Sequence, residues 1–475
     1  MAPIAQISAI PSLQTFDRQS ADLCQATSLS HGPHSSPPPF NDFQTSRLLE
    51  QQAAALIPGG SHTYAKGTDQ FPQMSPGFIA RGQGCHVWDV DGNEFIEYGM
   101  GLRAVTLGHA FPRVVDAVAK SLQLGTNFSR PSALEVQAAE RFLQVLPQYE
   151  MVKFAKNGSD VTTASVKLAR AYTGRSKIAV CADHPFFSCD DWFMTATPMH
   201  AGIPTEGDAL TLKFRYNDVA SVEALFAAHP HDIAALILEP ATSVEPAAGY
   251  LASLRALCDR HGCLLIFDEM ITGFRFHLRG ASAEYNVTPD LATFGKALAN
   301  GFALSALTGR REIMQQGGLM HDHDRVFLLS TTHGAETTGL VAGMETMRCY
   351  EELNVIEVLD RQGKRLARGV AQVVSQHGLQ GRLGCMGRPC NLVYFTRDAS
   401  GQPSQALRAL FMQEMIRHGI LGPSFVVSFS HTDTDIDRTI DAFDRSASVY
   451  ARALSEGVEK YLIGPPVKPV MRQKN

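Results

Sequence analysis

The sequence has no excess of basic charge. Lysine and arginine together number 42, aspartate and glutamate number 47, and the formal net charge is -5. A chain with this balance has no overall positive field to attract nucleic acid or an anionic lipid surface. Small molecules are therefore the expected partners, and neither nucleic acid nor a membrane is expected.

Long apolar runs and paired cysteine motifs are also missing. No uninterrupted apolar run approaches the roughly 18 residues that would suggest a membrane span. The nine cysteines are scattered, odd in number and never spaced as CxxC, which disfavours a disulfide or zinc framework and indicates reduced thiols in a protein core. The first 45 residues lack the charged start and apolar middle of a secretion signal, and they contain one arginine. A cytoplasmic location is therefore expected.

Two nucleotide-binding motifs are absent as well. No GxxxxGK[ST] occurs, and no GxGxxG follows a predicted strand. Neither a nucleotide P-loop nor a dinucleotide-binding fold is therefore indicated.

The chain has the composition of a globular protein, and its central part alternates strands with helices. Hydrophobic residues make up 44% and charged residues 19%, which is ordinary for a folded domain. Between about residues 150 and 310, apolar strands separated by helices predict an α/β fold with a parallel sheet covered on both faces. Before this region, alternating residues around Asp91 and Gly92 predict a tight hairpin. After about residue 345 the pattern becomes α+β again.

A candidate phosphate cradle lies between a predicted strand and helix. Asn157, Gly158, Ser159 and Asp160 occupy this junction. The start of a helix offers unpaired N–H groups, a positive dipole end and here a hydroxyl, which together suit a phosphate. The alternative is that Ser159 only caps its own helix.

Two acids, Asp268 and Glu269, stand at the end of a strand that should be buried on both faces. A buried carboxylate needs a cationic partner because an unpaired buried charge is expensive. A protonated heterocyclic nitrogen or a metal would serve. The alternative is an acid that caps a turn beside the following TGF loop.

Lys296 stands among small and apolar neighbours in "LATFGKALANGF" and follows the next predicted strand after Asp268. Both side chains should therefore reach the same end of the sheet. A lysine in a weakly polar pocket has its charged form disfavoured, which makes its amine a usable nucleophile and base. The alternative is a lysine at a helix start with its amine in water. Together, a phosphate cradle, a buried acid and this amine predict a pyridoxal 5'-phosphate site.

Several motifs resemble those of a known enzyme family. "LLIFDEMITGFR", "ATFGKALANGFALSALTGRREIM" and "YTGRSKIAV" are similar to class III aminotransferases, in the branch that contains glutamate-1-semialdehyde 2,1-aminomutase. The resemblance runs from about Gly59 to about Leu454. It implies a fold-type-I homodimer with active sites at the subunit interface, a mostly parallel seven-stranded sheet and a smaller α+β domain from both chain ends.

The implied domain organisation has four parts. Residues 1–45 would be a disordered extension, 46–104 and 346–475 the two parts of the small domain, and 105–345 the large cofactor-binding domain. The resemblance also assigns roles at the cofactor. Lys296 would be the Schiff-base lysine, Asp268 the partner of the ring nitrogen, and Gly158 and Ser159 would match the family's phosphate loop.

Three further residues would contact the cofactor by the same resemblance. Phe186, in "HPFFSCDDW", would stack on one face of the ring and Met270 would touch the other. Thr332, in "STTHGAET", would reach the phosphate bound by the neighbouring subunit.

The sequence departs from the aminomutase pattern at the substrate end. The family has an arginine for the substrate carboxylate where this chain has Lys66, which cannot form the same two-pronged contact. The segment "GPSFVVSFSHTDTDID" is shorter than the family's and lacks a glutamate that helps to gate the mutase reaction. Arg103 and Arg130 are new candidates for binding substrate, although each could equally make a structural or surface contact.

The segments "HTYAKGTDQFP" and "NFSRPSALE" look more like relatives that transaminate keto-sugars or carbocyclic ketones. The resemblance therefore implies an aminotransferase that moves an amino group from an amino acid, such as glutamate, to a ketone or aldehyde in a biosynthetic pathway. The alternatives are the aminomutase reaction, or transamination coupled to elimination on a cyclic keto acid.

Two hypotheses from other classes remain open at this point. The fold could survive as a non-catalytic binding module, against which the presence of both Lys296 and Asp268 argues. A metal could be chelated by His321, Asp322, His323 and Asp324. Polar runs between elements are more often solvated loops, so no metal is expected.

Overall fold

The computed structural model describes residues 43–184 and 186–474. Most of the predicted N-terminal extension, residues 1–42, lies outside the described residues. Helix α2 (Gln44–Leu56) begins inside the stretch assigned to that extension, and Phe43 before it is 3% exposed. A buried apolar residue is therefore already present at position 43, and the domain boundary at residue 45 stays a prediction.

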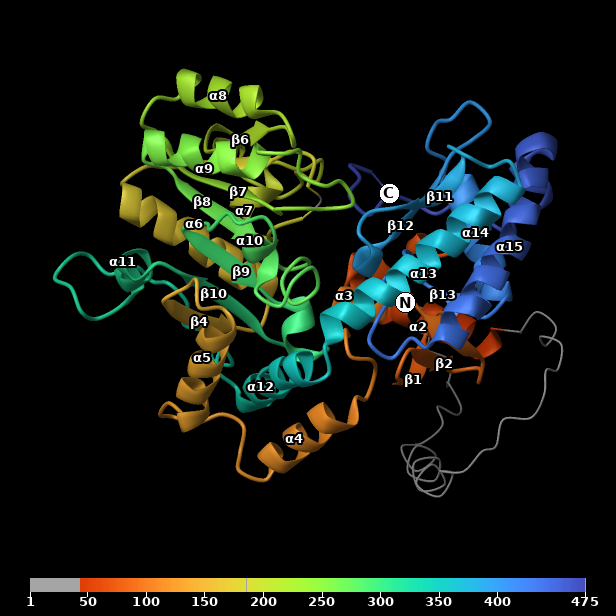
Figure 1. Cartoon of the computed structure of the whole chain (residues 1–475), viewed down its shortest axis with the longest axis horizontal. Helices are drawn as coiled ribbons and strands as arrows, with labels where there is room; N and C mark the ends of the chain where they lie inside the picture. The colour runs from red at the N-terminus through yellow and green to blue at the C-terminus, as the bar shows by residue number, and fades with distance from the viewer. Residues whose placement is uncertain (1–42, 185, 475) are drawn as a thin grey trace, which may run out of the picture. The chain divides into compact units, whose positions relative to one another are not determined.

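A seven-stranded sheet forms the centre of the fold (Figure 1). In spatial order its strands are β4 (Met151–Ala155), β10 (Ser305–Gly309), β9 (Leu291–Phe294), β8 (Leu264–Asp268), β7 (Ile233–Leu238), β5 (Lys177–Cys181) and β6 (Thr211–Phe214). All pairs from β9 to β6 are parallel, whereas β10 is antiparallel to both β9 and β4. The predicted mostly parallel sheet is confirmed.

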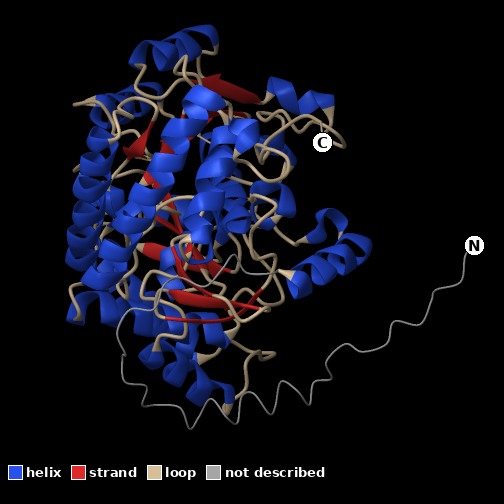
Figure 2. Ribbon diagram, turned by 90° about the vertical axis from the view of Figure 1, so that its right-hand side faces the viewer, coloured by secondary structure: helices blue, strands red, loops and turns tan. Residues whose placement is uncertain are grey.

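Helices cover both faces of this sheet (Figures 1 and 2). Ile178 and Val180 of β5 pack in one apolar cluster with α6 (Gly158–Thr173). Ala179 and Cys181, the alternate residues of the same strand, pack with α8 (Val219–Ala228) and α9 (Tyr250–His261). Because successive side chains of a strand point to opposite faces, continuous apolar strands such as β7 are what a doubly covered sheet requires.

A second sheet joins segments from both ends of the chain. It has the order β1 (Ile79–Gln83), β2 (His86–Asp89), β3 (Glu94–Glu97) and β13 (Ile420–Leu421). The predicted hairpin is present between β2 and β3, with Gly92 at φ 88°. Strand β13 is parallel to β3. This pairing supports the two-part small domain, whose boundaries stay a prediction.

Long helices near the C-terminus pack beside this second sheet (Figure 1). They are α13 (Val355–Gln376), α14 (Gln405–Arg417) and α15 (Asp433–Glu456). The remaining helices and strands are α3 (Met100–Arg103), α4 (Pro112–Leu122), α5 (Ala133–Val145), α7 (Asp191–Met194), α10 (Gly280–Glu284), α11 (Arg311–Met314), α12 (Thr337–Glu352), β11 (Leu383–Met386) and β12 (Val393–Thr396). Among the described residues, no helix combines the length and apolar character needed to cross a membrane.

The cysteines of the described chain are free thiols, as expected. Six of them are buried, Cys385 is partly buried, and Cys189 is exposed. The interpretation of the thiols as core residues is therefore wrong for Cys189, which is exposed on the loop after β5.

The element α3 is a left-handed turn. Met100, Gly101, Leu102 and Arg103 have φ values of 42°, 57°, 58° and 71°. A left-handed conformation costs roughly 1–2 kcal/mol for each residue with a side chain. The turn is closed by a hydrogen bond from the Arg103 N–H to the Gly99 carbonyl. Backbone strain of this kind persists only where surrounding contacts impose it, and it is frequent at functional sites.

Candidate active site

Asp268 and Lys296 lie at the carboxyl ends of two adjacent parallel strands. Asp268 is the last residue of β8 and is paired in register with Thr293 of β9. Lys296 follows β9 by two residues and begins a short 3-10 helix, η5 (Lys296–Ala299). Its φ of 42° lies in the left-handed region, so the chain turns sharply there. Ligands of open α/β sheets bind at this edge.

Asp268 is 2% exposed. Its Oδ1 accepts hydrogen bonds from the Met270 N–H at 3.0 Å and from the Thr293 hydroxyl at 3.2 Å. Burial raises the pKa of Asp268 to about 6, although the charge of Lys296 and these two hydrogen bonds oppose the rise. Both bonds are made to Oδ1, so the carboxylate is oriented by the protein at one oxygen.

The amine of Lys296 lies in the same electrostatic environment. Burial lowers the pKa of Lys296 below its ordinary value. The negative charges of Asp268 and Glu239 oppose this shift, and the positive charges of Arg103 and Arg275 add to it. Lowering the pKa increases the fraction of neutral amine, which is the form that acts as nucleophile or base.

The Met270 side chain lies between the start of helix α6 and the segment that precedes Lys296. A β-carbon added to Gly158 would lie 3.3 Å from the Met270 sulfur, and one added to Gly295 would lie 2.7 Å from it. The two glycines therefore flank the Met270 side chain. The first residue of α6 and the residue before Lys296 therefore lie next to the same side chain. The predicted phosphate cradle and the predicted amine are thus close together, around a side chain that stands two residues after Asp268 in the chain.

Ser159 does not cap its own helix. Asn157 occupies the N-cap position of α6, and the Ser159 hydroxyl instead accepts a hydrogen bond from the Cys189 N–H at 3.1 Å. The capping alternative for Ser159 is therefore wrong. The hydroxyl links the α6 start to the segment that contains Phe186. The remaining unpaired N–H groups that a helix start offers suit a phosphate.

Glu239 and His184 also belong to this edge and were not predicted. Glu239 follows β7 directly and is 4% exposed, and burial together with the charge of Asp268 raises its pKa to about 8. Its backbone N–H donates to Nδ1 of His184 at 3.0 Å. Burial lowers the pKa of His184 to about 4, so this imidazole is neutral. The signal for Glu239 was present, because "ILEP" places an acid after a buried strand as "IFDE" does.

Arg275 is a fully buried cation beside the site. It is 1% exposed, and its Nη2 donates to the Arg103 carbonyl and to the Thr106 hydroxyl at 3.1 Å. Its Nε and Nη1 are buried without a partner among the described residues. Burial lowers the pKa of Arg275. No local pattern indicated this role, since it depends on contacts with the distant left-handed turn.

The matched family decides what this arrangement is. Residues 66–443 match the model of the aminotransferase class-III family. This chain belongs to the class III aminotransferases. Enzymes of this class depend on pyridoxal 5'-phosphate, so both the enzyme class and the cofactor predicted from the sequence are confirmed, and the non-catalytic module is disfavoured.

Curated and solved relatives of this class III aminotransferase have more than one activity. A glutamate-1-semialdehyde 2,1-aminomutase of Desulforamulus reducens is 36% identical over 84% of this chain and 96% of its own length. A 3-aminobutyryl-CoA aminotransferase of Cloacimonas acidaminovorans is 32% identical over 86% of this chain and 98% of its own length. The solved FumI protein of Sphingopyxis sp. MTA144, in its PLP internal aldimine form, has a TM-score of 0.80 and 27% identity, covering 87% and 98% of the two chains.

The residues of the class III aminotransferase fit the cofactor by their donor chemistry. Asp268 is a buried carboxylate whose pKa is raised, so it is short of a cation, and a protonated ring nitrogen would provide one. Gly158 approaches Met270 too closely for a larger side chain to fit without a shift. The α6 start offers N–H groups to a phosphate, and Lys296 offers an amine to an aldehyde.

Phe186 and Thr332 are placed at the surface of this single chain. Phe186 is 47% exposed, and its ring meets Phe193 edge to face at a centroid distance of 5.8 Å. Thr332 is exposed in the segment before α12, and its carbonyl accepts a hydrogen bond from Asn127 at 3.1 Å. Their roles in stacking on the ring and reaching a neighbouring phosphate stay predictions.

The three substrate candidates differ in position. Arg103 lies at the site, because its charge acts on both Lys296 and Glu239. Its Nε donates to Asn391 at 2.8 Å, so it also has the structural contact that was its alternative role. Lys66 and Arg130 are exposed, and no described contact ties either of them to Lys296.

The metal hypothesis at residues 321–324 gains no support. The rings of His321 and His323 are 5.9 Å apart. Within residues 43–184 and 186–474, the side chains that could jointly hold an ion are found elsewhere, and the group does not include this loop.

Proposed function

We propose that this class III aminotransferase moves an amino group from an amino acid donor, glutamate or a similar one, to a ketone or aldehyde. We further propose that the acceptor is a keto-sugar or carbocyclic ketone of a biosynthetic pathway. The observation that carries the proposal is the placement of Lys296 and Asp268 at adjacent strand ends, with the α6 start beside them.

When bound, pyridoxal 5'-phosphate supplies an aldehyde that condenses with amines and a ring that accepts electrons. Lys296 Nζ, whose pKa is lowered, accepts the proton from the donor's Cα and returns it. Asp268 holds a proton at the ring nitrogen through its carboxylate, which Met270 and Thr293 orient at Oδ1. The N–H groups of the first turn of α6, at Gly158 and Ser159, hold the phosphate.

The preference for a neutral, hydroxylated acceptor is supported by the substrate end of the site. Lys66 presents one ammonium group where an arginine would grip a carboxylate with two parallel bonds. Arg103 has part of its guanidinium engaged by Asn391. The segments around Lys66 and Arg130 resemble those of enzymes that act on keto-sugars and carbocyclic ketones.

An acceptor screen tests this proposal. Protein loaded with pyridoxamine 5'-phosphate is mixed with keto-sugars, cyclic ketones and 2-oxo acids, and the absorption spectrum is followed in a single turnover. We expect keto-sugars or cyclic ketones to return the spectrum to the pyridoxal form at least tenfold faster than 2-oxo acids other than that of the donor. A return only with 2-oxo acids would contradict the proposed acceptor class and leave the aminotransferase assignment in place.

The aminomutase reaction is the second candidate, favoured by the 36% identity to the enzyme of Desulforamulus reducens. The two reactions differ in whether a keto product leaves the protein. In a single turnover with glutamate 1-semialdehyde, a mutase converts the substrate to its isomer without releasing a keto product. We expect no such isomerisation here, because the chain has Lys66 in place of the arginine and lacks the gating glutamate.

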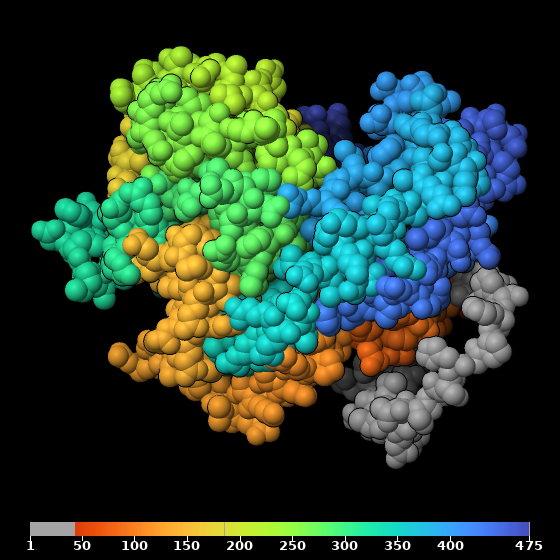
Figure 3. Space-filling model, in the orientation of Figure 1, coloured from red at the N-terminus to blue at the C-terminus, as the bar shows by residue number. Residues whose placement is uncertain are grey.

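We also propose that the protein works as a homodimer with shared active sites. Large apolar side chains are exposed on the loop after α4 and on the segment after α11, which projects from the chain (Figure 3). They are Leu124 (75%), Phe128 (51%), Leu319 (76%), Met320 (85%) and Phe327 (71%). Large contiguous patches of exposed apolar surface often mark a protein interface. Thr332 lies close to Phe327 in sequence, so a second subunit there would meet it.

Mixing two inactive variants tests the shared site. Lys296→Ala removes the amine of its own site, and Thr332→Asp places a negative charge where the neighbouring phosphate is expected. We expect a mixture refolded or co-expressed as heterodimers to regain activity that neither variant has alone, because one site of each heterodimer then has both native residues. A mixture as inactive as its components, although heterodimers are present by mass spectrometry, would contradict sharing through Thr332.

A further inference from the structure

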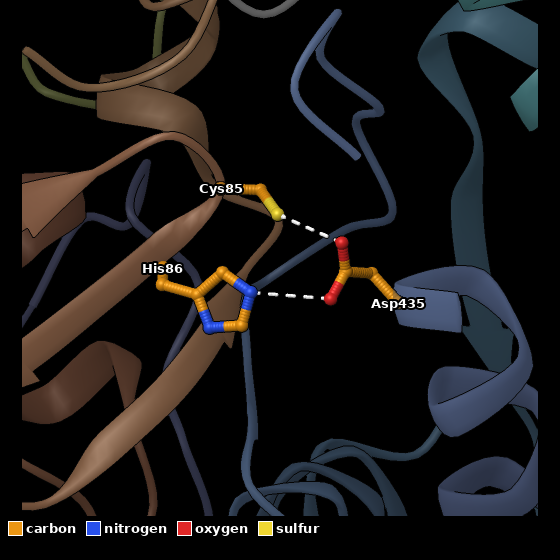
Figure 4. A group of neighbouring side chains, drawn as sticks. All are labelled: Cys85, His86 and Asp435. Atoms are coloured by element: carbon orange, nitrogen blue, oxygen red, sulfur yellow. Dashed lines mark hydrogen bonds and ion pairs between the residues drawn. The ribbon is translucent and has the colours of Figure 1, made fainter. Parts of the chain in front are cut away.

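Three side chains of kinds that often bind metal ions lie close together outside the active site. Cys85 and His86 stand at the start of β2, and Asp435 lies in the first turn of α15 (Figure 4). Cys85 Sγ is 3.5 Å from Asp435 Oδ2, and His86 Nε2 is 3.1 Å from Asp435 Oδ1. One ligand atom from each residue can be chosen so that all lie within 4.8 Å of one another.

The two contacts to Asp435, at 3.5 and 3.1 Å to its two different oxygens, are close to the ligand spacing around a tetrahedral ion of borderline softness. With metal–sulfur bonds of about 2.3 Å and metal–nitrogen or metal–oxygen bonds of about 2.0–2.2 Å, tetrahedral ligands lie about 3.3–3.6 Å apart. A thiolate, an imidazole and a carboxylate together are a ligand set typical of zinc, whereas calcium and magnesium prefer oxygen alone.

The surroundings orient the same atoms. Glu94 Oε1 lies 2.8 Å from Nδ1 of His86, so a carboxylate stands behind the ring on the side away from Asp435, although Nδ1 makes no hydrogen bond to it. A metal-binding histidine usually has such a carboxylate behind it. The Thr432 N–H and hydroxyl donate to Asp435 Oδ2 at 2.9 and 2.7 Å and fix the carboxylate.

An ion can reach this place from solvent. The Cys85 residue is 1% exposed, but the side chains of His86 and Glu94 are 24% and 50% exposed. The Cys85 thiol is therefore shielded from solvent, whereas the His86 imidazole is accessible to it. His86 and Asp435 are 349 residues apart in the chain, so an ion here would tie the second sheet to the last long helix.

We propose that Cys85, His86 and Asp435 form a zinc site, with Cys85 Sγ, His86 Nε2 and one carboxylate oxygen of Asp435 as protein ligands and a water as the fourth. Binding displaces the thiol proton and any proton on Nε2 to solvent, because only the thiolate and the imidazole lone pair bind the ion. The ion stabilises the contact between β2 and α15 and takes no part in amino transfer. The competing interpretation is a set of hydrogen bonds with no affinity for metal.

Zinc retention by the cofactor-loaded, untagged full chain tests the site. The protein is equilibrated with zinc, dialysed against metal-free buffer and analysed for bound metal by mass spectrometry, and its zinc absorption edge is recorded. We expect one zinc per chain with a single sulfur ligand. Cys85→Ala should lose this zinc, and Glu94→Gln should weaken zinc binding by about 10–100-fold. Zinc should raise the melting temperature of the native chain and leave that of Cys85→Ala unchanged.

Cys349→Ala is the matched control. Cys349 is also buried, and its Sγ lies 3.9 Å from a Glu345 carboxylate oxygen, but no histidine accompanies it in the metal-binding group. This variant should retain zinc fully. Retention of less than half an equivalent by the native chain, equal retention by Cys85→Ala, or an absorption edge without sulfur overturns the proposal. The absorption edge decides even if Cys85→Ala fails to fold, since it is measured on the native chain.

Discussion

Replacing Lys296 by alanine should abolish amino transfer and leave the fold intact. In the proposed function, the lysine supplies both the nucleophile that would hold the cofactor and the base that moves the substrate proton. Loss of a positioned acid or base alone lowers a rate by about 10²–10⁴-fold, so the turnover number should fall by at least that factor. The measurement is steady-state transamination with the donor and acceptor found in the screen.

The electrostatics of the site explain why the fold should survive this change. Burial lowers the pKa of Lys296, so the protonated amine is less favourable in the folded chain than in the unfolded chain. Removing it therefore costs no net favourable charge interaction, and the melting temperature should not fall. Borohydride reduction followed by digestion should couple the cofactor to the Lys296 peptide of the native protein and leave the variant unlabelled.

Lys177→Ala is the matched control for this experiment. Lys177 is also partly buried, pairs with Asp232 at 2.7 Å, and begins β5, where the chain enters the sheet rather than leaving it. It should retain activity within about twofold of the native protein and the same labelled peptide. Substantial turnover by Lys296→Ala, or a label on another lysine, would contradict the assignment.

Replacing Asp268 by asparagine should lower the turnover number by about 10²–10³-fold. The amide keeps an oxygen to accept from the Met270 N–H and the Thr293 hydroxyl, so the local geometry is retained. What is lost is the negative charge opposite the ring nitrogen, and breaking a buried charge pair costs about 3–5 kcal/mol. Part of this energy appears in cofactor affinity, so both the rate and the cofactor dissociation constant should be measured.

The neighbouring acid provides the control for Asp268. Glu269 is 0% exposed, and its carboxylate accepts from the Ala281 N–H at 2.8 Å, the Ser282 N–H at 3.0 Å and the Thr272 hydroxyl. It therefore secures the start of α10. Glu269→Gln should reduce thermal stability, with a smaller effect on the turnover number than Asp268→Asn. Equal losses of turnover in the two variants would remove the distinction between them.

Measuring cofactor affinity over a series of pH values separates the effect of the Asp268 charge from the effect of its side-chain geometry. In the chain without cofactor, burial raises the pKa of Asp268 to about 6. The carboxylate is therefore charged above about pH 6 and becomes neutral as the pH falls through that value. Cofactor affinity of the native protein should weaken over this window on acidification, and Asp268→Asn should lack that component. A native profile identical in shape to that of the variant would contradict the charge interaction.

The positions of Asp268 and Lys296 could be predicted from the sequence because each follows a strand whose pattern is unambiguous, whereas their proposed roles stay predictions. The apolar run of residues 263–267 precedes Asp268, and the buried strand Leu291–Phe294, in which only Thr293 is polar, precedes Gly295 and Lys296. Parallel neighbours end at one edge, so their terminal residues meet without any knowledge of long-range contacts. Gly158 was found for the same reason, since it stands where β4 gives way to α6.

The sequence did not reveal groups whose position depends on distant segments. Arg275 and the turn at Met100–Arg103 meet across 172 residues of chain, and the antiparallel β10 pairs with β4 from a similar separation. Local periodicity contains no information on such pairings. Lys66 was chosen by its place in a family motif and Arg130 as a new candidate in the segment "NFSRPSALE". A position in the chain does not give the direction of a side chain, and both residues are exposed in the single chain.

The left-handed turn at Met100–Arg103 bears on any attempt to make this enzyme more robust. Three of its four residues have side chains that disfavour this backbone conformation, so it is a natural target for redesign toward regular geometry. Such a redesign would reverse the hand of the turn and carry the Arg103 carbonyl away from Arg275, whose buried guanidinium would then lose an acceptor. A thermostable version obtained this way should gain tolerance to heat at the expense of the arginine pair next to Lys296, as expected where stability and activity oppose each other.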